Sequence, residues 1–214
     1  MSVRKSDVLD IAVLRRSKLG DRLAALSARH VALFAVACAE RMSSQLSAKP
    51  ARTRAPRQDL IRGPLDRMWL WLENEDAAML DQLRIDLRVI KEFLPTDPQE
   101  TALWDEEADA LFTTEHALEV CLAGGVEAAV GAAATTLDRA YHNAARVLTK
   151  DWSKEMPDEK IMADLAFRTE LDCQDEDLRA ISVERGLTIS VVKKVRRSAV
   201  SHRLQRVKDT ESDA

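Results

Sequence analysis

The chain has 214 residues, with 32 Lys and Arg against 36 Asp and Glu, and hydrophobic residues make up 46% of it. This apolar fraction is too high for a disordered chain, and three cysteines are too few for a disulfide-rich secreted scaffold. No stretch approaches the ~18 uncharged apolar residues of a membrane span, so we expect no membrane association. A net charge of −4 argues against a generally basic nucleic-acid binder.

The N-terminus and the cysteines both indicate a cytoplasmic protein. Arg4 and Lys5 are not followed by the apolar stretch of a signal peptide. Cys38, Cys121 and Cys173 lie far apart inside helical apolar patterns, without CxxC spacing. We therefore expect free, buried thiols, as is usual in a reducing compartment.

The first part of the chain predicts two helices and a loop. Ser6 can cap a short helix that ends at Gly20, and Asp21 can cap a second helix that continues to about Ser47. The run 31–39 is apolar on every side, so we expect the second helix to be central and buried. Residues 48–57 contain two prolines and four basic residues, which is typical of a loop.

Two amphipathic helices are predicted next. Gly63-Pro64 opens the first, because proline suits the first turn of a helix, and Leu65, Met68, Trp69 and Leu72 form its apolar face. Trp71 lies off this face, where it either makes a second contact or is exposed. Asn74 or Asp76 caps the following helix, and Pro95 ends it.

A helical hairpin is predicted in the middle of the chain. Its first helix begins with the carboxylates of residues 105–107, which favour the positive end of the helix dipole. Gly124-Gly125 then breaks the helix, and an alanine-rich helix follows. Small side chains let helices approach closely, so we expect these two helices to pack together around the glycine pair.

Two more helices are predicted at the C-terminal end. Met156-Pro157 starts one, and a break falls at Arg185-Gly186. A basic helix follows from about Thr188 to Val207, with a polar tail after it. Because no segment alternates with period two, we predict an all-α fold: a single compact domain of about seven or eight helices. Its expected parts are an N-terminal extension helix (1–20), a helical core (21–184) and a basic C-terminal helix with its tail (185–214).

Charge is distributed unevenly along the sequence. Residues 1–63 carry a net charge of +8, residues 64–182 of −16 and residues 183–214 of +4. In one interpretation the basic ends fold onto the acidic middle and the charges offset each other at close range. In the other, the acidic middle presents a field to a basic partner, which would speed their encounter.

Two sequence motifs resemble those of a known family. Phe34, Ala35, Ala39, Glu40 and Arg41 match a Phe-Ala-x-x-x-Ala-Glu-Arg helix, and residues 65–69, which include Trp69, match a Leu-Asp-x-x-Trp helix. Together they resemble the YjaG-like family of uncharacterised bacterial proteins, over roughly residues 21–192. The resemblance implies an all-helical intracellular domain and no particular activity. The N-terminal helix and the basic C-terminal helix look additional to it.

Glu40 and Arg41 directly follow the apolar run of the second helix. Two charges at such a position form buried salt bridges, cap a neighbouring helix, or place a ligand-binding arginine in a cleft. The sequence leaves the structural and the functional alternatives open.

No residue pattern indicates catalysis or a cofactor. Asp138 and His142 share a helix face, but we expect His116 to lie opposite residue 133 or 134, about two turns from His142, so these side chains do not close a metal site. Nucleotide-binding and hydrolase motifs are also absent from the sequence. We therefore expect no enzyme, no metal and no cofactor.

The leading functional hypothesis is a protein-binding or regulatory module with an acidic surface, for example an immunity-type or antitoxin-like inhibitor of a basic partner. The alternative is a DNA-associated regulator, because the last two helices have helix-turn-helix spacing. Homodimerisation through Trp71 and the alanine-rich face is a further possibility.

The acidic candidates are Asp105, Glu106, Glu107, Asp109, Glu155, Asp158, Glu159, Asp175, Glu176 and Asp177. The nucleic-acid candidates are Lys193, Lys194, Arg196, Arg197, Arg203 and Arg206.

Overall fold

The computed structural model describes residues 5–47, 58–94, 106–148, 158–183 and 186–211, with some helix ends described for the backbone alone. These residues form nine helices and no strand, which confirms the predicted all-α fold. No helix among them is long and apolar enough to cross a membrane. The helices are α1 (Lys5–Ala24), α2 (Ala28–Ser47), α3 (Gln58–Asn74), α4 (Ala77–Phe93), α5 (Glu106–Ala123), α6 (Val126–Leu148), α7 (Asp158–Met162), α8 (Leu165–Ser182) and α9 (Ile189–Glu211).

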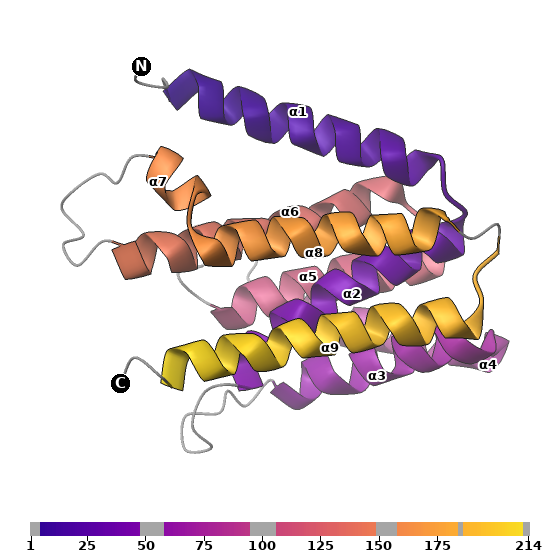
Figure 1. The fold of residues 1–214 in the computed structure, drawn as a ribbon. Coiled ribbons are helices and arrows are strands. Elements are labelled where there is room, and N and C mark those ends of the chain that lie inside the picture. Colours follow the sequence, from indigo (N-terminus) through magenta and orange to yellow (C-terminus); the bar gives the residue numbers. More distant parts are fainter. Residues whose placement is uncertain (1–4, 48–57, 95–105, 149–157, 184–185, 212–214) are drawn as a thin grey trace.

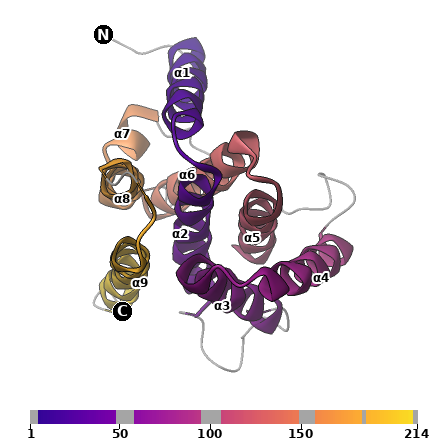
Figure 2. The same cartoon turned by 90° about the vertical axis from the view of Figure 1, so that its right-hand side faces the viewer.

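Helix α2 is the centre of the molecule. Figure 2 shows it surrounded by α3, α5, α6, α8 and α9, and it contacts each of these five helices. Every residue from Val31 to Ala39 is at most 1% exposed. The prediction of a central, buried second helix is therefore confirmed, and its physical basis is that a helix apolar on every side needs neighbours on every side.

The first helix is longer than predicted. Helix α1 continues through Gly20 and ends at Ala24, so Gly20 is not a helix end and Asp21 is not a cap. Glycine inside a helix lowers helix stability by only about 1 kcal/mol relative to alanine, and tertiary packing can offset this loss. The chain breaks at Ser27 instead, whose hydroxyl accepts a hydrogen bond from the backbone N–H of His30. In Figure 1, α1 lies over α6 at one side of the bundle.

Helix α3 also begins earlier than predicted. It starts at Gln58, so Pro64 lies inside the helix and does not open it. Proline within a helix removes one backbone hydrogen bond. Two features of the extra turn offset this loss, since Ile61 is 1% exposed and Arg62 forms two ion pairs.

The two ends of α4 agree with the sequence prediction. The carboxylate of Asp76 accepts a hydrogen bond from the backbone N–H of Ala78, as an N-cap does. The helix ends at Phe93, and Leu94 is extended with φ −72° and ψ 140°. This is the conformation favoured before a proline, and Pro95 follows in the sequence.

Helices α5 and α6 form the predicted hairpin. Gly124 adopts a φ of +72° between them, a conformation that other residues rarely adopt. Gly131 lies so close to His116 that an added Cβ would be 2.9 Å from the imidazole Nε2. His116 therefore faces residue 131, near the predicted 133 or 134. The buried alanines of α6, including Ala129, Ala132 and Ala133, pack within this chain.

The C-terminal third differs from the prediction in one respect. The helix expected between Met156-Pro157 and the break at Arg185-Gly186 is divided into α7 and α8, with a turn in which the backbone N–H of Asp164 bonds to the carbonyl of Ile161. Helix α9 belongs to the main core, because Val192, Val195 and Ala199 are at most 1% exposed. The predicted loop 48–57 lies outside the described residues.

Candidate functional site: buried ion pairs on both sides of α2

The candidate site is built on Glu40 and Arg41, the two charges that end the apolar run of α2. Consecutive helical residues point about 100° apart, so the two side chains reach different neighbours. Arg41 contacts α8, whereas Glu40 contacts α3. Arg41 is 3% exposed and Glu40 is 1% exposed. The structure therefore shows buried salt bridges at both residues, as one of the sequence alternatives predicted.

Arg41 is shared between two carboxylates of α8. Its Nε lies 3.2 Å from both carboxylate oxygens of Glu170, and one terminal nitrogen donates to Asp177 Oδ2 at 2.5 Å. A second terminal nitrogen lies 3.4 Å from the sulfur of Cys38. Glu170 and Asp177 are seven residues apart, so two helical turns place them on the same face of α8. The amide of Gln174, between them, donates to Glu170 Oε1 at 3.1 Å.

The electrostatics of this group follow from its burial. Burial raises the pKa of Asp177, and the neighbouring Glu170 acts in the same direction against the opposing effect of Arg41. For Arg41, burial acts to lower the pKa, but Glu170 and Asp177 together raise it well above its usual value. Burial also raises the pKa of the Cys38 thiol. A thiol that does not ionise is a poor nucleophile, so Cys38 is a packing residue.

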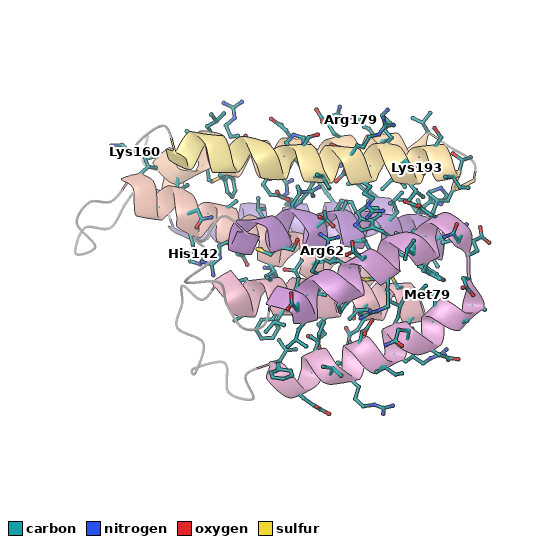
Figure 3. The ribbon with its side chains drawn as sticks, turned by 90° about the horizontal axis from the view of Figure 1, so that it is seen from below. Arg62, Met79, His142, Lys160, Arg179 and Lys193 are labelled. Carbon is teal, nitrogen blue, oxygen red and sulfur yellow. The ribbon has the colours of Figure 1, made fainter. Side chains whose placement is uncertain are left out.

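Glu40 organises a second network on another face of α2, about 100° around the helix from that of Arg41. It accepts hydrogen bonds from Arg62 at 2.7 and 3.1 Å and from the indole nitrogen of Trp69 at 2.9 Å. Figure 3 shows Arg62 between α2 and α3. Arg196 of α9 completes the group, because it bonds to Glu73 at 3.2 Å and its guanidinium lies 5.6 Å from the centre of the Trp69 ring. This network joins α2, α3 and α9.

The uneven charge along the sequence is explained by these contacts. Basic residues of the first segment pair with acidic residues of the middle segment, and Arg196 of the last segment pairs with Asp66 and Glu73. The pairs that link the first and middle segments are Arg16–Asp138, Arg22–Asp175, Arg29–Glu75, Arg41–Glu170, Arg41–Asp177 and Arg62–Asp66. The interpretation in which the basic ends fold onto the acidic middle is therefore the one that the structure supports.

Among the acidic candidates whose side chains are described, only Glu176 is exposed without an ion pair to this chain. Asp177 is only 2% exposed and cannot belong to an acidic surface, because its carboxylate is bound to Arg41 inside the fold. Asp109 pairs with Arg139, and Asp175 pairs with Arg22. Glu176 is exposed on α8. The remaining candidates are Asp105 and Glu155, which lie outside the described residues, and Glu106, Glu107, Asp158 and Glu159, which begin α5 and α7 but whose side chains are not described.

The described basic candidates on α9 differ in whether their side chains are paired within this chain or exposed. Arg196 is engaged with Glu73 and Trp69, whereas Lys193, Lys194 and Arg197 are exposed. Arg203 and Arg206 lie in α9, but their side chains are not described. Figures 1 and 2 show α8 and α9 side by side and antiparallel, not crossing steeply as in a helix-turn-helix. The helix-turn-helix interpretation was therefore wrong: both helices are long and each packs along α2.

The partners of Glu40 and Arg41 were not predicted from the sequence, although one signal was present. Glu170 and Asp177 fall on the same helical face as the buried residues Cys173 and Leu178. Carboxylates on an apolar face need a buried cation, and Arg41 was a candidate for it. Among the described residues, no three His, Cys, Asp or Glu side chains are grouped as metal ligands would be.

Comparison with known proteins identifies the family. No curated protein matches the chain. A crystal structure of a DUF416 family protein from Shewanella baltica OS155 is similar, with a TM-score of 0.67 and 18% sequence identity over 85% of this chain and 93% of that chain. The model of the protein family DUF416, described as a protein of unknown function, matches residues 18–204. The match includes α9 up to residue 204, so the C-terminal helix is not an addition to the family domain. The chain belongs to the DUF416 family.

Proposed function

We propose that this chain is a non-enzymatic protein-binding module whose contact surface is the outer face of α4. The observation that carries the proposal is a row of apolar side chains at four-residue steps: Ile85 is 48% exposed, Val89 is half-buried and Phe93 is 41% exposed. Residues four apart lie on the same side of a helix, so the three side chains form one continuous stripe.

This stripe is separate from the face that α4 buries in the protein. Leu83 and Ile90 are at most 1% exposed and belong to the core. A surface helix normally has one apolar face, which packs on the core, and a polar opposite face. Helix α4 lies at the outer edge of the bundle beside α3 and α5 (Figure 2), and Ile85 on its second apolar face is 48% exposed, so we expect a partner to bind there. The exposed charges of Arg84 and Arg88 beside the stripe resemble the polar rim of an interface.

The apolar surface replaces the acidic surface as the expected point of contact. Of the four acidic candidates with described side chains, Asp109, Asp175 and Asp177 are paired with basic residues of this chain. An immunity-type or antitoxin-like inhibitor remains one form of the proposal. In that form the inhibitor contacts its target mainly through α4, and charge has a secondary role.

The test compares two variants of the full chain as baits in nuclease-treated native extracts. The double variant Ile85→Lys with Val89→Lys places charges in the stripe. The control Val183→Lys adds a charge at another exposed apolar residue, which is 82% exposed. We expect a stoichiometric partner of the natural chain and of the control to be lost from the α4 variant. A partner retained equally by all three baits contradicts the assignment to α4.

A second candidate function rests on the exposed side chains of Lys193, Lys194 and Arg197. They could contact phosphates, which supplies affinity for nucleic acid without sequence specificity. Three phosphate contacts give a slope of about −2.7 for log K against log salt. Replacing all three residues with Gln should bring this slope close to zero. An unchanged slope would exclude α9 as the nucleic-acid contact.

A further inference from the structure

Three helices line a small, partly open cavity that none of the functions above uses. It lies between α1, α6 and α8 and has a volume of about 50 Å³. A single water needs roughly 10–15 Å³ by this measure, so the cavity accommodates about three to five non-hydrogen atoms. Its apolar wall comes from α6 and includes Val130, Ala133 and Leu137. The cavity is therefore large enough for a small organic molecule and too small for a nucleotide.

Arg15 is the distinctive polar residue of this cavity. It is half-buried, and within the described part of the chain it makes no ion pair or hydrogen bond. Its neighbours on α1 differ in this respect, because Arg16 pairs with Asp138 and Arg22 pairs with Asp175. Burial lowers the pKa of Arg15, and Arg22 acts in the same direction against the opposing effects of Asp175 and Glu170. A guanidinium that has lost part of its hydration without gaining a partner is suited to binding an anion.

The remaining polar wall of the cavity is held in place by the fold. Gln174 of α8 donates from its amide nitrogen to the backbone carbonyl of Ala133 at 3.0 Å and to Glu170 at 3.1 Å. These bonds fix α8 against α6 beside Arg15. The cavity is thus preformed, with an unpaired cation on α1 and a rigid, largely apolar wall opposite.

The lining of the cavity restricts the kind of anion. The carboxylates around Arg15 are offset by cations of this chain, because Asp138 pairs with Arg16, Asp175 with Arg22 and Glu170 with Arg41. The wall opposite Arg15 is largely apolar, which favours an anion with an aliphatic chain over a phosphate. A carboxylate also matches the planar fork of a guanidinium, which can donate two parallel hydrogen bonds to it.

We propose that the cavity between α1, α6 and α8 binds a short aliphatic carboxylate. Its carboxylate group accepts hydrogen bonds from the guanidinium of Arg15. Its two or three carbons, the carboxylate carbon included, keep it within about five non-hydrogen atoms and pack against Val130, Ala133 and Leu137. A ligand of so few atoms binds with a dissociation constant of about a millimolar, because binding free energy is limited by the number of atoms.

The test is an NMR titration of the full chain with acetate, propionate and butyrate at constant ionic strength. We expect saturable shifts of the Ala133, Ala134 and Val130 signals, strongest with propionate and weaker with butyrate, which exceeds the capacity of the cavity. Propionamide has the same shape without the charge and should cause no such shifts, and inorganic phosphate should bind at least tenfold more weakly than propionate. Absence of saturable shifts, or equal binding of propionamide or phosphate, would overturn the proposal.

Variants separate the role of Arg15 from general effects on the fold. Arg15→Gln should weaken propionate binding tenfold or more, and Arg15→Lys, which keeps the charge without the fork, should weaken it less. Lys18→Gln is the matched control, since Lys18 is an exposed cation of the same helix, and it should leave affinity within twofold. Ala134→Val narrows the cavity without changing charge and should also weaken binding. Binding unchanged in both Arg15→Gln and Ala134→Val would place the ligand elsewhere and contradict the assignment.

Discussion

Arg41 and Glu170 are 129 positions apart in the sequence, yet the Nε of Arg41 lies 3.2 Å from both carboxylate oxygens of Glu170. Both side chains are at most 3% exposed. With Asp177 they form a buried group of one cation and two carboxylates that joins α2 to α8. Removing one partner from such a group leaves an uncompensated buried charge, which is among the costliest changes in a protein interior.

The turn between α5 and α6 offers a matched pair of glycine substitutions. Gly124 has a φ of +72°, and an added Cβ would lie 3.0 Å from the Cβ of Ala28, whereas a Cβ on Gly125 meets no atom within 4 Å. We expect Gly124→Ala to lower the free energy of unfolding by about 1–3 kcal/mol, and Gly125→Ala to change it by less than ~1 kcal/mol. Urea denaturation measures both. Equal effects of the two changes would contradict the described turn.

His30 should make stability depend on pH. Burial, and secondarily Arg29, lowers its pKa below the usual 6.5, and its Nδ1 lies 2.6 Å from the hydroxyl of Ser27. A histidine with a lowered folded pKa binds fewer protons when folded than when unfolded. The free energy of unfolding therefore decreases as the pH falls from 6.5 towards the folded pKa.

Two measurements check this prediction. NMR titration should place the midpoint of the His30 imidazole below 6.5. In the variant His30→Gln, the fall in stability between pH 6.5 and pH 5 should be smaller than in the natural chain. A midpoint at or above 6.5 would show that the side chain is not held in its neutral form.

The C-terminal helix should be required for folding. Val192, Val195 and Ala199 of α9 are buried in the main core, and Arg196 joins the network of Trp69. Each fully buried valine contributes about 1.5–3 kcal/mol, which is a large part of the stability of a typical domain. We expect a chain truncated after residue 184 to lose cooperative thermal unfolding, as followed by circular dichroism.

A second truncation provides the control for this experiment. A chain that ends at His202 keeps all the buried positions of α9 named above, so it should still unfold cooperatively. A folded, cooperative 1–184 fragment would show that α9 is an appendage, as the sequence had suggested.

The helices that were predicted best are those with a strong local signal. The run 31–39 is apolar on every side, and Asp76 and the glycine pair at 124–125 have the chemistry of helix ends. The errors at Gly20 and Pro64 share a cause: both residues are helix breakers by intrinsic preference, and tertiary contacts outweighed that preference. Such contacts join distant segments and leave no local trace.

The candidate site was partly visible in the sequence. Glu40 and Arg41 stood out because they end an apolar run, and a buried salt bridge was one of the expectations. Their partners could not be predicted, because Glu170 and Asp177 depend on how α8 packs against α2. Charge counts along the sequence have the same limit. They reveal the acidic middle segment, but only the fold shows that Asp175 forms an ion pair with Arg22.

The central claim is that opposite charges of this chain are used internally, with Arg41 holding α2 to α8. The most direct test is a urea-denaturation cycle with Arg41→Met, the pair Glu170→Gln with Asp177→Asn, and all three changes together. We predict that Arg41→Met lowers the free energy of unfolding by about 3–5 kcal/mol, and that adding the two carboxylate changes recovers at least ~1 kcal/mol, since no buried charge is then unpaired. Arg84→Met, which removes an exposed pair with Asp81, should cost less than ~1 kcal/mol. A cost for Arg41→Met no greater than for Arg84→Met, with no recovery in the triple variant, would contradict the claim.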